Sequence, residues 1–191
     1  LYSGGGYRDL LRQPEQQHWT LQHWMLLLIA AGTLVMLCRL LVQHYSLYRL
    51  RSKARLLHNA EVKLYQVDAP IMPFSYGKAI YVNAAQHGED ELREIIRHEF
   101  VHVSQQHTVD MLWSEWLCIV NWFNPFAWLL RKAIRQNLEY IADRQVLQHG
   151  MDRKAYQYLL LKVIGVKQFT FAAPFNFTSI KNRIAMMNKM R

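Results

Sequence analysis

Cysteine is scarce in this chain, and its scarcity excludes two kinds of small protein. Of 191 residues only Cys38 and Cys118 are cysteines, and both lie inside apolar runs. They supply neither a disulfide framework nor a cysteine zinc cluster. Acidic residues are also few, because 14 Asp and Glu stand against 23 Lys and Arg, which gives a net charge of +9. This surplus suits an anionic partner such as a membrane surface or a nucleic acid.

The overall composition excludes a disordered chain. Hydrophobic residues make up 51% and charged residues 19% of the sequence, which is enough apolar material for a sizeable core. The length allows one domain of catalytic size with a short appendage. No nucleic-acid-binding fold is recognisable, so a basic nucleic-acid-binding module is the weaker alternative. The first residue is Leu1, and we expect the sequence to be a piece of a longer protein.

One hydrophobic run is long enough to cross a membrane. Residues 24–42 contain a single charge, Arg39, and a helix needs roughly 20 apolar residues to cross the hydrocarbon layer. A buried core helix is the alternative. The flank after the run is basic without an acid up to residue 60, and the positive-inside rule therefore places it in the cytoplasm. The predicted organisation is an extracytoplasmic linker (1–23), a transmembrane helix (24–42), a basic juxtamembrane segment (43–60) and a cytoplasmic domain (61–191).

The rest of the sequence predicts an α+β fold that is mainly helical, with a small sheet. Alternating apolar residues indicate strands, and apolar residues at helical spacing indicate helices. The expected elements are strands at 61–67 and 78–83, helices near 89–106, 111–123, 124–149 and 152–164, a loop or strand over 169–177, and a short helix from Ser179.

The helix at 89–106 carries an H-E-x-x-H motif, His98-Glu99-Phe100-Val101-His102. Histidines four residues apart share one helix face, so both imidazoles can bind one Zn²⁺ at about 2.0–2.1 Å. Glu99 is rotated from His98 by about 100°, which places it to act as a base toward water and not as a third ligand on the same face.

A catalytic zinc needs a third protein ligand. The metzincin pattern is excluded, because Thr108 and Gln105 stand where it has histidine and glycine. His107 is one residue out of step and would point away from the metal on a continuing helix. Downstream, Glu139 and Asp143 lie one turn apart on a predicted helix. Glu139 can complete the site, and Asp143 can accept a hydrogen bond from a ligand imidazole.

Several blocks together resemble one family. H-E-F-V-H at 98–102, N-W-F-N-P-F-A-W at 121–128, E-Y-I-A-D at 139–143 and the terminal I-K-N-R-I-A-M-M resemble the BlaR/MecR-type membrane metallopeptidases, which are gluzincins. The resemblance implies one Zn²⁺ per chain, held by His98, His102 and Glu139. It also implies that Glu99 is the general base and that the catalytic domain faces the cytoplasm at the bacterial inner membrane.

The same resemblance implies a zinc endopeptidase in regulated proteolysis and signal transduction. In better-known members an extracellular sensor domain detects β-lactam antibiotic, and the protease then triggers loss of a transcriptional repressor, with self-cleavage as part of activation. We therefore expect a protein or peptide substrate, such as a repressor or the chain itself, besides contact with the lipid bilayer and no direct contact with nucleic acid. The alternatives are a quality-control protease of the HtpX or Ste24 type, which share H-E-x-x-H and E-x-x-A-D, and a catalytically silent membrane scaffold.

Two further expectations concern surfaces. The strand at 78–83 offers an edge on which an extended substrate can pair through Ala79, Ile80, Tyr81 and Val82, the alternative being a plain sheet strand. An aromatic-rich stretch over 113–128 is either a belt at the membrane interface or part of the core.

Overall fold

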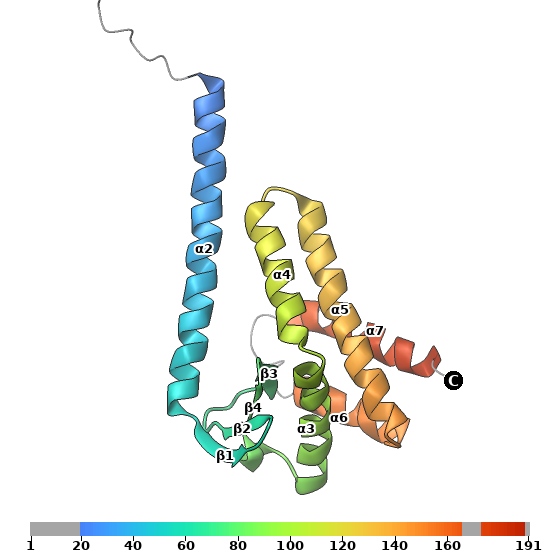
Figure 1. Ribbon diagram of the computed structural model, residues 1–191. Coiled ribbons are helices and arrows are strands. Elements are labelled where there is room, and N and C mark those ends of the chain that lie inside the picture. The colour runs from blue at the N-terminus through green and yellow to red at the C-terminus, as the bar shows by residue number, and fades with distance from the viewer. Residues whose placement is uncertain (1–19, 166–172, 190–191) are drawn as a thin grey trace, which may run out of the picture.

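The structure is a computed structural model that describes residues 20–165 and 173–189 (Figure 1). Most of the predicted linker, residues 1–19, and the first part of the predicted loop, residues 169–172, lie outside the described residues. The remainder confirms an α+β fold, mainly helical, with a small sheet and a long apolar helix before it.

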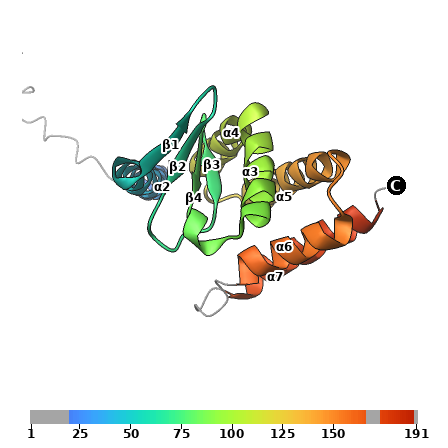
Figure 2. The ribbon, with the colours of Figure 1, turned by 90° about the horizontal axis from the view of Figure 1, so that it is seen from below.

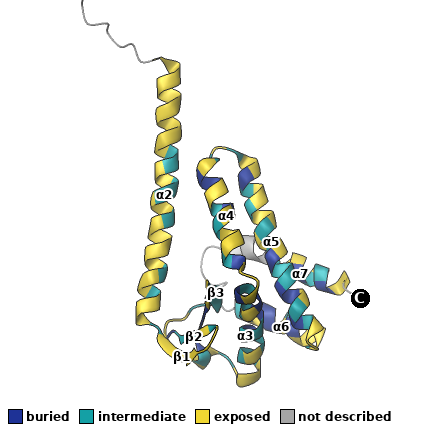
Figure 3. Cartoon of the chain, in the orientation of Figure 1, coloured by how far each residue is buried: buried dark blue, intermediate teal, exposed yellow. Residues whose placement is uncertain are grey.

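Helix α2 (Leu21–Lys53) stands beside the rest of the chain and has no buried residue (Figures 1 and 3). Among the described residues it is the one helix long and apolar enough to cross a membrane. The predicted membrane run, 24–42, lies inside it. The following basic segment continues the helix to Lys53, where positive charges suit the helix C-terminus, and then forms β1 (Arg55–Asn59), a strand that the sequence analysis missed.

The sheet has four strands in the order β1-β2-β4-β3. Strands β2 (Lys63–Gln66) and β4 (Ala79–Val82) are parallel, and β3 (Phe74–Tyr76) is antiparallel to β4. Strands β2 and β3 therefore pair with the two edges of β4, and the four residues of β4 are buried. The expectation that Ala79, Ile80, Tyr81 and Val82 offer a free edge is wrong. Gly77, with a φ of 58°, lies in the turn that reverses the chain between β3 and β4, and β3 is the outer strand.

Among the described residues a short 3-10 helix, η1 (Ala84–Gln86), and five α-helices follow the sheet. The α-helices are α3 (Glu89–Ser104), α4 (His107–Val120), α5 (Pro125–Gln148), α6 (Arg153–Gly165) and α7 (Ala173–Lys189). Helix α4 begins four residues before its predicted start, and α7 begins at Ala173, inside the segment predicted as loop or strand. Asn124 caps α5 as expected: its side chain accepts a hydrogen bond from the N–H of Phe126, and Pro125 takes the first helical position.

Helix α3 lies at the centre of the domain that follows α2. Figure 2 shows it between the sheet and α5, with α6 and α7 lying together along one side. Its Val103 packs against Ile80 and Val82 of β4. On another face, Ile95 joins a core cluster with residues of α5, α6 and α7. The members of that cluster are Ile95, Val146, Tyr156, Leu159, Leu160 and Met187.

We expect Val146→Ala to lower the free energy of unfolding by about 2 kcal/mol, because it removes fully buried methyl groups and leaves a cavity in this cluster. Chemical denaturation in detergent measures the change. Val109→Ala on α4, where the valine is 46% exposed, is the control and should have little effect. Equal losses in the two variants would contradict this assignment of the core.

Candidate metal centre

Two neighbouring helices bring together three side chains that can bind a metal ion. His98 and His102 come from α3, and Glu139 comes from α5. The two Nε2 atoms lie 3.2 Å apart, and His98 Nε2 lies 3.4 Å from Glu139 Oε2. Ligand atoms of the three residues all fall within 4.8 Å of one another. Two imidazoles and one carboxylate are a donor set that suits a catalytic zinc with an open fourth position.

Tyr156 of α6 orients the His98 ring. Its hydroxyl lies 2.8 Å from His98 Nδ1 and donates a hydrogen bond, also 2.8 Å long, to Asp143 Oδ1. Because the hydroxyl has a single proton, His98 Nδ1 must donate its own proton to the hydroxyl oxygen. The lone pair of His98 is therefore on Nε2, which faces His102 and Glu139. Such a hydrogen bond fixes the tautomer that a metal ligand needs.

This arrangement refines the role predicted for Asp143. Its carboxylate lies 3.6 Å from His98 Nδ1, too far for a hydrogen bond, so it acts on the ring through Tyr156. Tyr156 is fully buried and comes from a helix that carries no recognisable motif. Sequence reasoning missed it for that reason.

His107 lies against the second histidine, contrary to the expectation that it points away. Its Nδ1 is 2.7 Å from His102 Nδ1, and its Nε2 is 3.0 Å from the side-chain oxygen of Gln105. The expectation assumed a continuing helix. Instead Gln106 adopts a left-handed conformation with a φ of 56°, so α3 ends and α4 begins at His107. The turn aims the buried His107 ring back at His102 and restricts the orientation of the His102 ring.

Arg183 of α7 holds both carboxylates of α5. Its Nη1 lies 2.9 Å from Glu139 Oε2, while Nη2 and Nε bond the two oxygens of Asp143 at 2.6 and 2.8 Å. Asp143 is completely buried and Arg183 nearly so. A buried carboxylate is tolerated when it is paired in this way. The sequence analysis used the R-I-A-M-M ending for the resemblance and gave Arg183 no role.

Burial and neighbouring charges shift the pKa values of the three predicted ligands in a way that favours a bound cation. Burial would raise the pKa of Glu139, but the hydrogen bond to His98 and the charge of Arg183 outweigh it and hold that pKa well below its usual range. Burial, helped by His98, lowers the pKa of His102 to about 3, so this imidazole is neutral. At His98 burial lowers the pKa, but the hydrogen bond and charge of Glu139, together with the charge of Glu99, outweigh burial and raise it. Positive charge is therefore favoured between His98 and Glu139.

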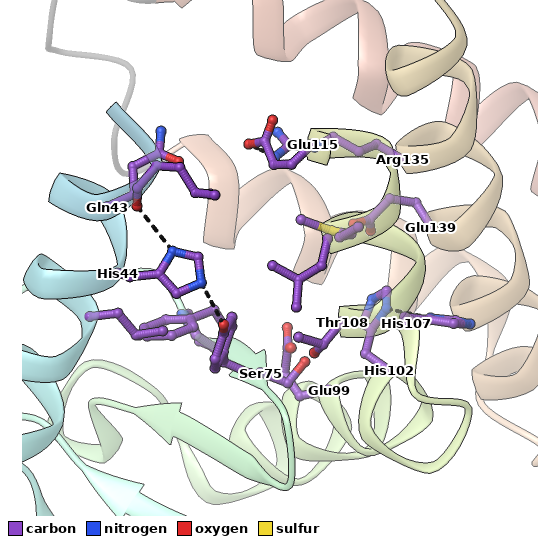
Figure 4. Close-up of a pocket in the computed structure, with 17 residues that line it drawn as sticks. Gln43, His44, Ser75, Glu99, His102, His107, Thr108, Glu115, Arg135 and Glu139 are labelled. Carbon is purple, nitrogen blue, oxygen red and sulfur yellow. Dashed lines mark hydrogen bonds and ion pairs between the residues drawn. The ribbon is translucent and has the colours of Figure 1, made fainter. Parts of the chain in front are cut away.

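Glu99 stands at a cavity of about 360 Å³ that adjoins the centre. Figure 4 shows Glu99, His102 and Glu139 facing Gln43 and His44 of α2 across this cavity. Burial raises the pKa of Glu99, while a hydrogen bond from the Ser75 side chain and the charge of His98 oppose the shift. A carboxyl group with a raised pKa is suited to accept a proton and later return it.

The free edge strand borders the same cavity. All three residues of β3, Phe74, Ser75 and Tyr76, line it together with residues of α3, α4 and α5. A second cavity, of about 150 Å³, lies toward α6 and also has Glu99 and Glu139 in its wall. Space for a bound molecule is thus present on both sides of the centre.

Comparisons with known proteins point to a peptidase family. The family model described as BlaR1 peptidase M56 matches residues 11–187. Regulatory protein BlaR1 of Bacillus licheniformis is 36% identical over 107 residues, an alignment that covers 50% of this chain. The chain spans 17% of the length of that relative.

Removal of the Tyr156 hydroxyl should weaken metal binding. We expect Tyr156→Phe to lower zinc affinity by about 10- to 100-fold, because His98 Nδ1 loses its hydrogen-bond partner and its link to Asp143. Competition with a chromophoric chelator measures the affinity. Tyr158→Phe removes a hydroxyl from an exposed tyrosine of the same helix and should leave it unchanged. An equal affinity in the parent and both variants would show that Tyr156 does not support the site.

Proposed function

Because the chain belongs to the BlaR1 peptidase M56 family, we propose that it is a membrane-anchored zinc endopeptidase that hydrolyses peptide bonds in regulated proteolysis. The observation that carries the proposal is the convergence of His98 Nε2, His102 Nε2 and Glu139 Oε2 beside a cavity that also contains Glu99.

In this proposal His98, His102 and Glu139 hold one Zn²⁺. When bound, the ion lowers the pKa of a water molecule toward 7 and polarises the scissile carbonyl group. Glu99 accepts a proton from the attacking water and delivers it to the leaving amine. Tyr156 and His107 keep the two imidazole rings in place.

Arg183 and Asp143 support the third ligand. Arg183 fixes the position of Glu139, and the hydrogen bond to His98 together with the charge of Arg183 keeps that carboxylate ionised. Asp143 holds Arg183 from the opposite side and at the same time accepts the hydrogen bond of Tyr156. The paired carboxylate of Asp143 thus supports proposed ligands on both α3 and α5.

The substrate in this proposal is an extended segment of protein that pairs with β3. This strand has one unpaired edge among the described strands, and its residues line the cavity beside Glu99. Main-chain pairing at an edge positions a peptide bond with little demand on its side chains. The selection of the substrate then depends on how it is presented to the cavity.

We place residues 24–42 of α2 across the bacterial inner membrane, with 1–23 outside and the basic segment 43–60 and the domain 61–191 in the cytoplasm. The exposed Arg49, Arg51, Lys53 and Arg55 support this orientation. The similarity to a regulatory protein supports a role in signalling, with a repressor or the chain itself as the substrate.

Zinc content tests the ligand set. We expect about one zinc per detergent-purified chain and a much lower content in Glu139→Ala, because that variant loses one of three protein ligands. Metal analysis after dialysis gives the ratio. Glu89→Ala, at an exposed carboxylate in the first turn of α3, is the control and should retain the metal. A folded parent that binds no zinc would refute the enzyme proposal.

Glu99→Gln should separate metal binding from catalysis. It preserves the shape of the side chain but removes the base, so we expect normal zinc content and a loss of proteolysis of about 10²- to 10⁴-fold. Cleavage of the chain itself, or of a denatured protein substrate, is followed by gel electrophoresis. Glu89→Gln is the matched control. Undiminished cleavage by Glu99→Gln would exclude Glu99 as the base.

A further inference from the structure

Helices α4 and α5 form a hairpin whose far end is apolar on its outside. Residues 116–130 contain no charged side chain. Large apolar side chains that the fold leaves at least 48% exposed cover this part of the hairpin, among them Trp116, Val120, Phe123, Phe126, Leu129 and Leu130. A water-soluble surface rarely presents a contiguous apolar area of this kind.

The tip of the hairpin touches the apolar part of α2. The indole N–H of Trp122 donates a hydrogen bond to the carbonyl of Ile29 at 3.4 Å. The indole ring also packs on Gly32, where an added Cβ would collide with it. Ile29 and Gly32 both lie inside the run 24–42, so the tip is level with the part of α2 that we place in the membrane (Figure 1).

The first charges of the hairpin lie where the apolar run of α2 ends. Glu115 of α4 and Arg131 of α5 form an ion pair of 2.6 Å. Glu115 lines the same cavity as Leu40 and Gln43 of α2. From Gln43 to Ile29 the rise along α2 is on the order of 20 Å at 1.5 Å per residue. The charge-free turns of α4, residues 116–120, rise by on the order of 8 Å, so the charge-free part of the hairpin lies beside part of this stretch.

We propose that the α4–α5 hairpin is a re-entrant membrane element, with lipid hydrocarbon covering residues 116–130 beside α2. The inference rests on the membrane placement of α2 and is independent of the metal chemistry. Continuity of the exposed apolar surface with that of α2 favours lipid as the occupant. The hairpin enters from the cytoplasmic side and returns to it.

The polar groups at the tip have partners inside the protein, as hydrocarbon requires. The Trp128 indole donates to the carbonyl of Trp122 at 2.9 Å, and the Asn124 side chain accepts from the N–H of Phe126 at 3.0 Å. Pro125, at the first position of α5, has no N–H to satisfy. The Cys118 thiol donates to the carbonyl of Ala127. The tip therefore enters lipid without leaving these groups unpaired.

Fluorescence quenching in vesicles of phosphatidylethanolamine and phosphatidylglycerol tests the proposal. The full chain, with Cys38→Ala and Cys118→Ala, carries one bimane label at Phe126→Cys, Val35→Cys or Tyr158→Cys. Phe126 and Tyr158 are matched exposed aromatics, 74% and 73% exposed, on the tip and on α6, and Val35 marks α2. We expect acyl-chain nitroxides to quench the labels at 126 and 35 several times more strongly than the label at 158, and iodide to quench only the label at 158.

Iodide quenching at 126 as strong as at 158 would overturn the proposal, because the tip would then lie in water. Protection of 126 from both quenchers would also overturn it, since protein would then cover the tip. Failure of lipid quenching at 35 would remove the membrane placement of α2 and this inference with it. None of these readouts depends on zinc or on proteolysis, so they leave the metal-site proposal to its own tests.

Discussion

The buried carboxylate of Asp143 is the constraint on which the rest of the centre depends. A fully buried charge is costly unless it is paired, and here Arg183 and Tyr156 satisfy it. These contacts join α5 to α6 and α7. Because the hydroxyl of Tyr156 also reaches His98, the same group ties all three helices to α3. Loss of the carboxylate would leave a buried guanidinium and a buried hydroxyl without their main partners, as well as a loose ligand.

Helix α3 connects this polar cluster to the cavity in which we propose that the substrate binds. One of its faces packs on β4 and another on the core shared with α5, α6 and α7, so the histidines and Glu99 are fixed between two apolar contacts. Residues of α2 line one side of the cavity beside them, and His44 of α2 bonds the Tyr76 hydroxyl at 3.0 Å. The long apolar helix is thus part of the wall of the site as well as an anchor.

The sequence predicts what is local in this structure. The spacing of His98, Glu99 and His102 on one helix predicts two ligands and a base. Glu139 belongs to a second pair one helical turn apart, so all three proposed ligands could be chosen before any fold was known. The bounds of α3 and α5 are also close to the prediction. Other features depend on contacts distant in sequence. The outer position of β3 follows from strand pairing, and the approach of His107 follows from the left-handed Gln106. Tyr156 and Arg183 become part of the site only when α6 and α7 pack against α5.

Arg183 follows Asp143 in the chain, and this order bears on how the protein is made. Asp143 and Arg183 are separated by 40 positions. During synthesis from the N-terminus, α3 and α5 therefore leave the ribosome well before the guanidinium that pairs with the two carboxylates of α5. The centre reaches its final geometry only after α7 has emerged and packed, so a chain released early by truncation would carry every proposed ligand and yet lack a finished site.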